Sequence, residues 1–270
     1  RMFSFSVKIL VTSIINTINR NVLTFIIGHK FPMAAVGNFT QANKWNTMAY
    51  STITGTIEQV AQPVLAQIAD DNERERRVFR KLMRFTAFFS FPALFGLSLV
   101  SREFILITIG MKWIECVPLL QVLCIGGAFF AFNTMYQQLA ISSGRSDIYM
   151  WCNIFQIALQ IALILLTCSR GIYFMVVAYT VFSILWLGVW QYQARRIIGI
   201  RLREVLADTM PFMLSAAAVM AATYFLTKPV GSIWILFPLR IAIAAALYLA
   251  IMKIANVEIL NECLRFVRKK

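Results

Sequence analysis

Residues 40–62, TQANKWNTMAYSTITGTIEQVAQ, form a polar stretch in a chain that is otherwise strongly apolar. The stretch contains a lysine, a glutamate, three glutamines and two asparagines, together with several hydroxyl side chains. The chain as a whole is 59% hydrophobic and has a mean hydropathy of +0.70. The fold depends on whether this stretch is a soluble loop or a polar helix inside a membrane.

The overall composition is typical of a membrane protein. Charged residues make up 14% of the 270 residues, whereas soluble domains carry about 25%. The net charge of +14 could also indicate a nucleic-acid partner. We exclude nucleic acid because the basic residues cluster at the ends of apolar runs, as they do beside a cytoplasmic leaflet.

Apolar runs predict an all-α, polytopic bundle of about eight transmembrane helices. A spanning helix needs about 20 mostly apolar residues. Five runs meet this requirement clearly: residues 84–101, 117–142, 148–167, 171–190 and 208–226. A sixth, residues 232–254, carries Arg240 but is otherwise strongly apolar. Two more polar segments, residues 3–28 and 34–69, complete the set, and the second contains the opening stretch.

The charges between these segments support eight crossings. With Arg1 in the cytoplasm, seventeen Lys and Arg fall in cytoplasmic segments and five in outer segments, which is a strong positive-inside bias. A loop at residues 34–69 would break this alternation, so we predict a membrane helix there. We expect both ends of the chain in the cytoplasm, and we expect DDNERER (70–76) to be a cytoplasmic loop whose charges pair within it.

The polar residues of the second helix recur at steps of three or four and so share one helical face. We call this face the polar stripe: Gln41, Lys44, Thr47, Ser51, Thr54, Glu58 and Gln62. A charged side chain at mid-bilayer costs about 2.5–3.5 kcal/mol on insertion scales. The stripe is therefore expected to face protein or a water-filled cavity rather than lipid.

The first helix has a similar polar group, formed by Asn16, Asn19 and Arg20. At 1.5 Å per residue, Arg20 lies about 12 Å from the outer end of its helix and Lys44 about 15 Å from the outer end of the next. Two cations at one depth repel unless an anion lies between them. We predict an anionic ligand at Arg20 and Lys44, with Asn16, Asn19 and Gln41 beside it. Pairing with residues of another part of the protein is the alternative.

Other ionisable and polar residues have simpler interpretations. Glu58 is a candidate proton- or cation-coupling residue, and Arg240 is expected to snorkel toward the outer interface. We predict no catalytic residue, metal site or cofactor, since His29 stands alone at a helix boundary and no catalytic motif occurs. Interhelical hydrogen bonding is favoured over substrate contact for a further set of amides: Asn133, Gln137, Gln138, Asn153, Gln156 and Gln160.

Three stretches resemble the polysaccharide-biosynthesis flippases of the multidrug/oligosaccharidyl-lipid/polysaccharide exporter superfamily. They are IINTINRNVLTFIIGHKFPMAAVGNFTQANKW (14–45), VAQPVLAQIADDNERERRVFRKLMRFTAFFSFPALFGL (60–97) and GMKWIECVPLLQVLCIGG (110–127). The resemblance implies about fourteen helices in two lobes around a cavity. It also implies export of a lipid-linked glycan, carried on undecaprenyl diphosphate, across the bacterial inner membrane.

Within that family, this chain would be the C-terminal portion. Residues 1–194 would form the second, six-helix lobe, residues 195–254 two additional membrane helices, and residues 255–270 a basic, amphipathic cytoplasmic tail. The N-terminal lobe of the same protein would be the missing partner, with membrane lipids around both. Arg20 and Lys44 would then meet the diphosphate of the carrier.

Three other functions stay open. A drug or cation antiporter of the same superfamily would prefer acidic residues, and we expect only Glu58 within the spans. A membrane glycan polymerase or acyltransferase would carry large outer loops, whereas the outer loops predicted here are short. A non-transporting scaffold would not need the polar stripe. We therefore predict a transporter, not an enzyme.

Overall fold

The computed structural model describes residues 26–69 and 71–260, which form seven long α-helices and, within these ranges, no strand. The helices are α2 (Met33–Ala66), α3 (Asn72–Thr108), α4 (Cys116–Ser142), α5 (Ser146–Thr167), α6 (Ile172–Ile198), α7 (Leu202–Thr227) and α8 (Ile233–Ile254). Short 3-10 turns lie at Met111–Trp113 and Cys168–Arg170. The predicted all-α membrane bundle is confirmed.

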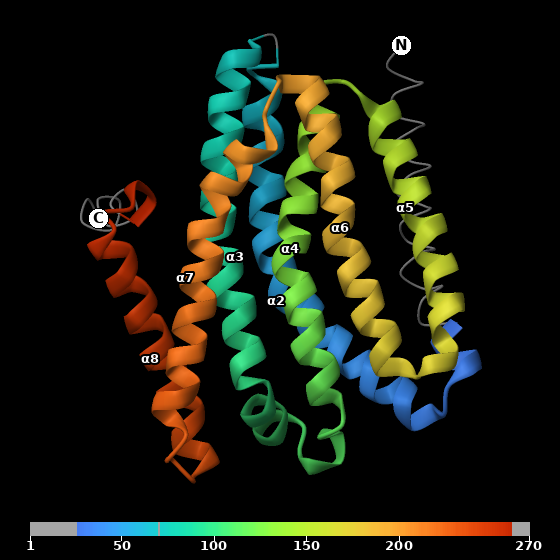
Figure 1. Ribbon diagram of the computed structural model, residues 1–270, viewed down its shortest axis with the longest axis vertical. Helices are drawn as coiled ribbons and strands as arrows, with labels where there is room; N and C mark the ends of the chain where they lie inside the picture. Colours follow the sequence, from blue (N-terminus) through green and yellow to red (C-terminus); the bar gives the residue numbers. More distant parts are fainter. Residues whose placement is uncertain (1–25, 70, 261–270) are drawn as a thin grey trace.

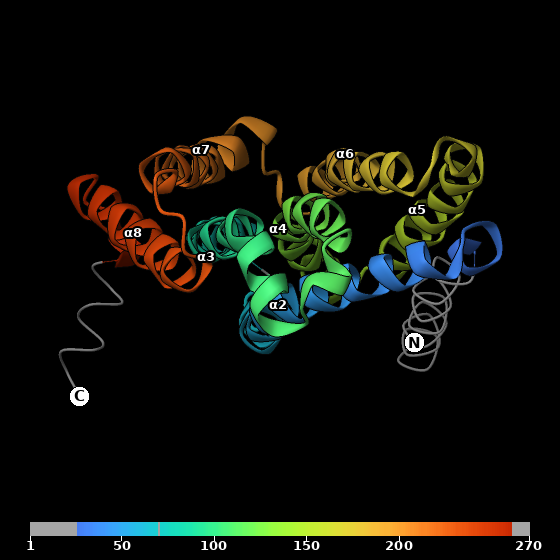
Figure 2. The same cartoon turned by 90° about the horizontal axis from the view of Figure 1, so that it is seen from below.

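Helix α4 occupies the middle of the bundle (Figures 1 and 2). Helices α2, α3 and α6 pack against it, α5 packs on α6, and α7 and α8 pack on α3. Consecutive helices run antiparallel, so the starts of α3, α5 and α7 gather at one end of the bundle (Figure 1). This end carries Arg74, Arg76, Arg77, Arg145, Arg195, Arg196, Arg201 and Arg203, and we call it the basic end.

The opening stretch lies inside α2, which is one continuous helix of 34 residues. At 1.5 Å per residue it is about 51 Å long, more than enough to cross a bilayer. Six other described helices are apolar enough to be identified as membrane spans by composition. Helix α2 is not among these six because of its polar residues, yet it lies beside α4 within the bundle (Figure 1). The predicted helix at 3–28 falls almost wholly outside the described residues.

The prediction that DDNERER is a loop is wrong. Helix α3 begins at Asn72, where the Asp71 carboxylate accepts a hydrogen bond from the Arg74 backbone N–H at 3.0 Å. Glu73 and Glu75 lie in the first turn, where negative charge favours the helix dipole. Helix α3 therefore starts three turns before the predicted span.

The basic segment between α6 and α7 is also shorter than expected for a loop. Gly199 ends α6 with φ +70°, and α7 begins at Leu202.

A pair of glycines in α4 allows its neighbours to approach closely. A Cβ added at Gly127 would overlap the Asn46 Oδ1 atom of α2 and lie 3.3 Å from Leu94 Cδ1 of α3. A Cβ added at Gly126 would lie 3.0 Å from Thr180 Cγ2 of α6. Small residues at membrane-helix interfaces permit this kind of backbone contact.

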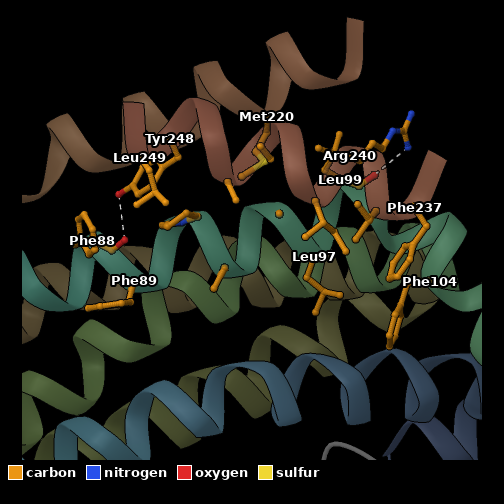
Figure 3. A pocket seen from close by; sticks show the side chains of 17 residues that line it. Phe88, Phe89, Leu97, Leu99, Phe104, Met220, Phe237, Arg240, Tyr248 and Leu249 are labelled. Carbon is orange, nitrogen blue, oxygen red and sulfur yellow. Dashed lines mark hydrogen bonds between the residues drawn. The ribbon is translucent and has the colours of Figure 1, made fainter. Parts of the chain in front are cut away.

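Arg240 does not snorkel to the interface, as the sequence suggested. It is buried, and its Nη1 atom lies 2.9 Å from Glu103 Oε2 of α3. Its guanidinium also donates to Thr227 Oγ1 of α7 and to the Leu99 carbonyl (Figure 3). The prediction failed because Glu103 was assigned to an outer loop, whereas α3 continues to Thr108.

We predict that Gly127→Leu destabilises the bundle by about 1–3 kcal/mol or more, because the interior cannot absorb the added volume. Gly188→Leu is the matched control, since nothing lies within 4 Å of a Cβ added there. The apparent melting temperature in detergent measures both. Equal melting temperatures for the two variants would contradict the close contact of α2 with α4.

We also predict that Glu103→Gln destabilises the protein by about 3–5 kcal/mol, because it leaves the buried Arg240 charge uncompensated. The double variant Glu103→Leu with Arg240→Met removes both charges and should recover most of the loss. Thermal unfolding of the two variants checks this. A double variant less stable than Glu103→Gln would show that the pair is not the source of the effect.

Candidate functional site

Most of the polar stripe of α2, apart from Thr54, lies on a face that the described helices leave at least partly uncovered. Lys44, Ser51, Glu58 and Gln62 are exposed, Gln41 and Thr47 are half-buried, and Thr54 is buried. The opposite side of α2 supplies buried residues to the core, among them Phe39, Ala42, Ile57 and Ala61. Helix α2 lies on one side of α4, while α6 and α7 lie on the other (Figure 2). The stripe therefore points away from the bundle.

Lys44 is the cation of this face. Its Nζ atom lies 6.0 Å from the centroid of the Trp45 ring, and that ring packs edge-on against Phe104 of α3 at 4.9 Å. Within the described part of the chain, Lys44 forms no ion pair. A cation held beside an aromatic ring and lacking a counter-charge is suited to an anionic ligand.

Glu58 occupies the same helix but not the same depth. It is 14 residues beyond Lys44, about 21 Å along the axis, so the two charges do not neutralise each other. The side chain is exposed and pairs with no cation in residues 26–69 and 71–260. Its role in ion coupling stays a prediction.

The other three predicted ligand residues, Asn16, Asn19 and Arg20, lie outside the described residues. The structure thus shows Lys44 and Gln41 on the same helix face and leaves their pairing with Arg20 a prediction. His29 lies at the end of a helical segment and is exposed. Residues 26–69 and 71–260 contain no cluster of three or more His, Cys, Asp or Glu that could hold a metal ion.

A pocket lies between α2, α3 and α4, on the side of α2 away from the polar stripe, and no pattern in the sequence indicated it. Its volume is about 380 Å³, and it is lined by Thr52, Ile53, Thr56, Ile57, Val60, Leu82, Phe85, Thr86, Phe89 and Met135. The Oγ1 atom of Thr86 is buried there and has no hydrogen-bond partner among the described residues. This hollow is therefore separate from the polar stripe.

Three of the six amides that the sequence singled out in α4 and α5, Gln137, Asn153 and Gln160, form interhelical hydrogen bonds among the described residues. Gln137 Nε2 donates to Asn153 Oδ1 at 3.4 Å, and Gln160 Nε2 donates to Ser183 Oγ of α6 at 3.2 Å. Tyr136 Oη, which the sequence analysis did not single out, donates to Gln191 Oε1 at 2.7 Å. Asn133 and Gln138 each keep a buried side-chain oxygen without a partner in the described chain.

The charges at the start of α3 pair with α7, and not within their own segment as predicted. We call Arg76, Arg80 and Arg84 the arginine ladder. Arg80 Nε lies 2.6 Å from Asp208 Oδ2, and Arg76 pairs with Glu204. The partners lie 128 residues apart, so sequence proximity gave no sign of the contact.

Comparisons with known proteins agree with this architecture. Residues 1–118 match the family described as polysaccharide biosynthesis protein. The predicted resemblance is confirmed. The chain is 31% identical over 154 residues to the lipopolysaccharide biosynthesis protein WzxC of Escherichia coli, covering 57% of this chain and 31% of that protein. It is 30% identical over 150 residues to the teichuronic acid biosynthesis protein TuaB of Bacillus subtilis, covering 55% of this chain and 31% of that protein.

The fold also has a solved counterpart. The lipid II flippase MurJ, in an inward closed conformation, superposes with a TM-score of 0.76 at 15% identity, covering 94% of this chain and 53% of that one. At this identity the likeness concerns the fold alone. The aligned parts amount to about a third of the length of the curated relatives.

We predict that cysteines introduced at Lys44 and Ser51 react with a charged, membrane-impermeant thiol reagent, after the native cysteines have been replaced. Leu166→Cys on α5 is the control, because that side chain is 76% exposed on an apolar helix surface and should face lipid. Labelling of Leu166→Cys alone would contradict a water-filled space beside the stripe.

Proposed function

We propose that this chain is part of a transporter that moves a lipid-linked oligosaccharide or polysaccharide precursor from the cytoplasmic to the outer leaflet of the bacterial inner membrane. The observation that carries the proposal is Lys44, a cation without a counter-ion among the described residues, on the open polar face of an apolar helix bundle. The names of WzxC and TuaB, which concern lipopolysaccharide and teichuronic acid, support a glycan substrate. Because the matches cover about a third of those relatives, the complete activity would require the rest of the transporter.

The polar stripe would bind the head group of the substrate. Lys44 would attract the diphosphate, since a charge interaction strengthens where hydrocarbon lowers the dielectric. Arg20 would supply the second cation, with Asn16, Asn19 and Gln41 as hydrogen-bond donors. The hydroxyl side chains of Thr47 and Ser51 would bind sugar hydroxyl groups, while the polyprenyl tail stays in lipid.

Translocation would proceed by alternating access. A second lobe facing α2 would enclose the stripe, and rocking of the two lobes would open the cavity to one side of the membrane at a time. The basic end would face the cytoplasm according to the positive-inside rule. Residues 1–194 would form this chain's lobe and residues 195–254 the additional helices. We infer transport without a catalytic step.

A drug or cation antiporter is the second candidate function, and Glu58 is the observation that favours it. Two other carboxylates of the membrane helices, Glu103 and Asp208, are occupied by arginines. Glu58 is therefore the carboxylate of α2 available to a cation on the open face. If glycan export is driven by an ion gradient, Glu58 is also the candidate residue for coupling.

We predict that Lys44→Ala in the full-length protein lowers glycan export at least tenfold, while Lys44→Arg retains most of it because the charge remains. Lys112→Ala is the matched control, since Lys112 also lies beside a tryptophan ring, at 5.9 Å from Trp113, but on a different surface. Surface glycan is quantified, and a fluorescent fusion reports membrane insertion. Normal export by Lys44→Ala, and by Arg20→Ala, would rule out the diphosphate site.

A further inference from the structure

A second apolar groove runs between α3 and α8, away from the polar stripe (Figure 3). Its volume is about 530 Å³, and it extends along α3 from Phe88 to Phe104. At 1.5 Å per residue this is a length of about 24 Å, more than half of a hydrocarbon core of about 30 Å. The groove is therefore long enough for an alkyl chain that reaches in from one leaflet.

The two ends of the groove differ in charge. At the end of the groove far from the arginine ladder, Arg240 lines the groove. Glu103 neutralises this arginine, with its Oε2 atom 2.9 Å from Arg240 Nη1. At the basic end, Arg84 precedes Phe88 by one helical turn and so lies on the same face of α3. The ladder to which Arg84 belongs has three guanidinium groups, whereas residues 26–69 and 71–260 supply it with two carboxylates, Glu204 and Asp208.

The surplus positive charge falls on Arg84. Arg80 takes the close contact with Asp208, with its Nε atom at 2.6 Å and Nη2 at 3.2 Å. Arg84 Nε is 3.7 Å from the same carboxylate, which is too long for a hydrogen bond. That Nε atom is buried and lacks a hydrogen-bond partner among the described residues, while 38% of the side chain remains exposed.

We propose that this end of the groove binds one anionic membrane phospholipid, with its phosphate on Arg84 and an acyl chain between α3 and α8. A phosphodiester carries one negative charge, which matches the single surplus guanidinium. A diphosphate would bring at least two negative charges, more than this guanidinium can neutralise. The lipid would stay bound and bridge α3 to α8, so the proposal does not depend on the transport proposed for the polar stripe.

The test is lipid binding to the purified full-length protein in detergent, measured by native mass spectrometry with phosphatidylglycerol and phosphatidylcholine as probes. We expect phosphatidylglycerol to bind at least tenfold more tightly. Arg84→Gln should remove that preference, and Arg84→Lys should retain it. Arg77→Gln is the matched control, because it removes one exposed positive charge from the same helix and should leave the preference intact.

Two further variants separate binding from folding. Ala245→Trp fills the groove that Ala245 lines and should weaken binding of both lipids, whereas Ala246→Trp, at an exposed position outside the lining, should not. Asp208→Asn frees a second guanidinium and should strengthen phosphatidylglycerol binding about threefold, a gain that misfolding cannot produce.

Three results would overturn the proposal. The first is equal lipid preference in Arg84→Gln and Arg77→Gln. The second is unchanged binding in Ala245→Trp. The third is displacement of phosphatidylglycerol, one for one, by a polyprenyl diphosphate at lower concentration, which would assign the groove to the transported carrier instead.

Discussion

The close contact between α2 and α4 at Gly127 sets the rotation of α2 about its own axis. With Asn46 held against the α4 backbone, Lys44 and its neighbours are turned about 200° away at 3.6 residues per turn. The polar stripe must then lie on the open face of the bundle. Gly126 permits a similarly close approach of Thr180 of α6 on the other side of α4. The proposed substrate surface on α2 thus depends on Gly127, a residue that carries no side chain.

The charges of the membrane helices fall into two groups. Arg240 and Arg80 have carboxylate partners on other helices, Glu103 and Asp208, and these pairs fasten α8 and α7 to α3. Lys44 and Glu58 have no such partner within the described chain. Ionisable residues inside membranes are costly and mostly functional, so we propose the unpaired group as the binding site. The paired group explains how α7 and α8 are held against α3.

The helices could be predicted from the length of the apolar runs and the sign of the loop charges, because both follow from the cost of placing polar groups in hydrocarbon. The start of α3 could not be predicted in this way. Its charged sequence is locally typical of a solvated loop, and its arginines contact Glu204 and Asp208 only in the folded protein. Arg240 was misjudged for the same reason. The period of the polar stripe correctly predicted that residues 40–62 are helical, while its contact with a ligand stays a prediction. The pocket at Thr86 is formed by several helices, so the sequence of one helix does not indicate it.

The central prediction is that the α2 stripe contacts the glycan during export. A photo-crosslinking amino acid at Ser51, in the full-length protein in cells that make the glycan, tests this contact directly, and the same group at Leu166 measures background. We expect a glycan-bearing crosslinked product from Ser51 and none from Leu166. Crosslinks from Ser51 that contain only protein or phospholipid would contradict it.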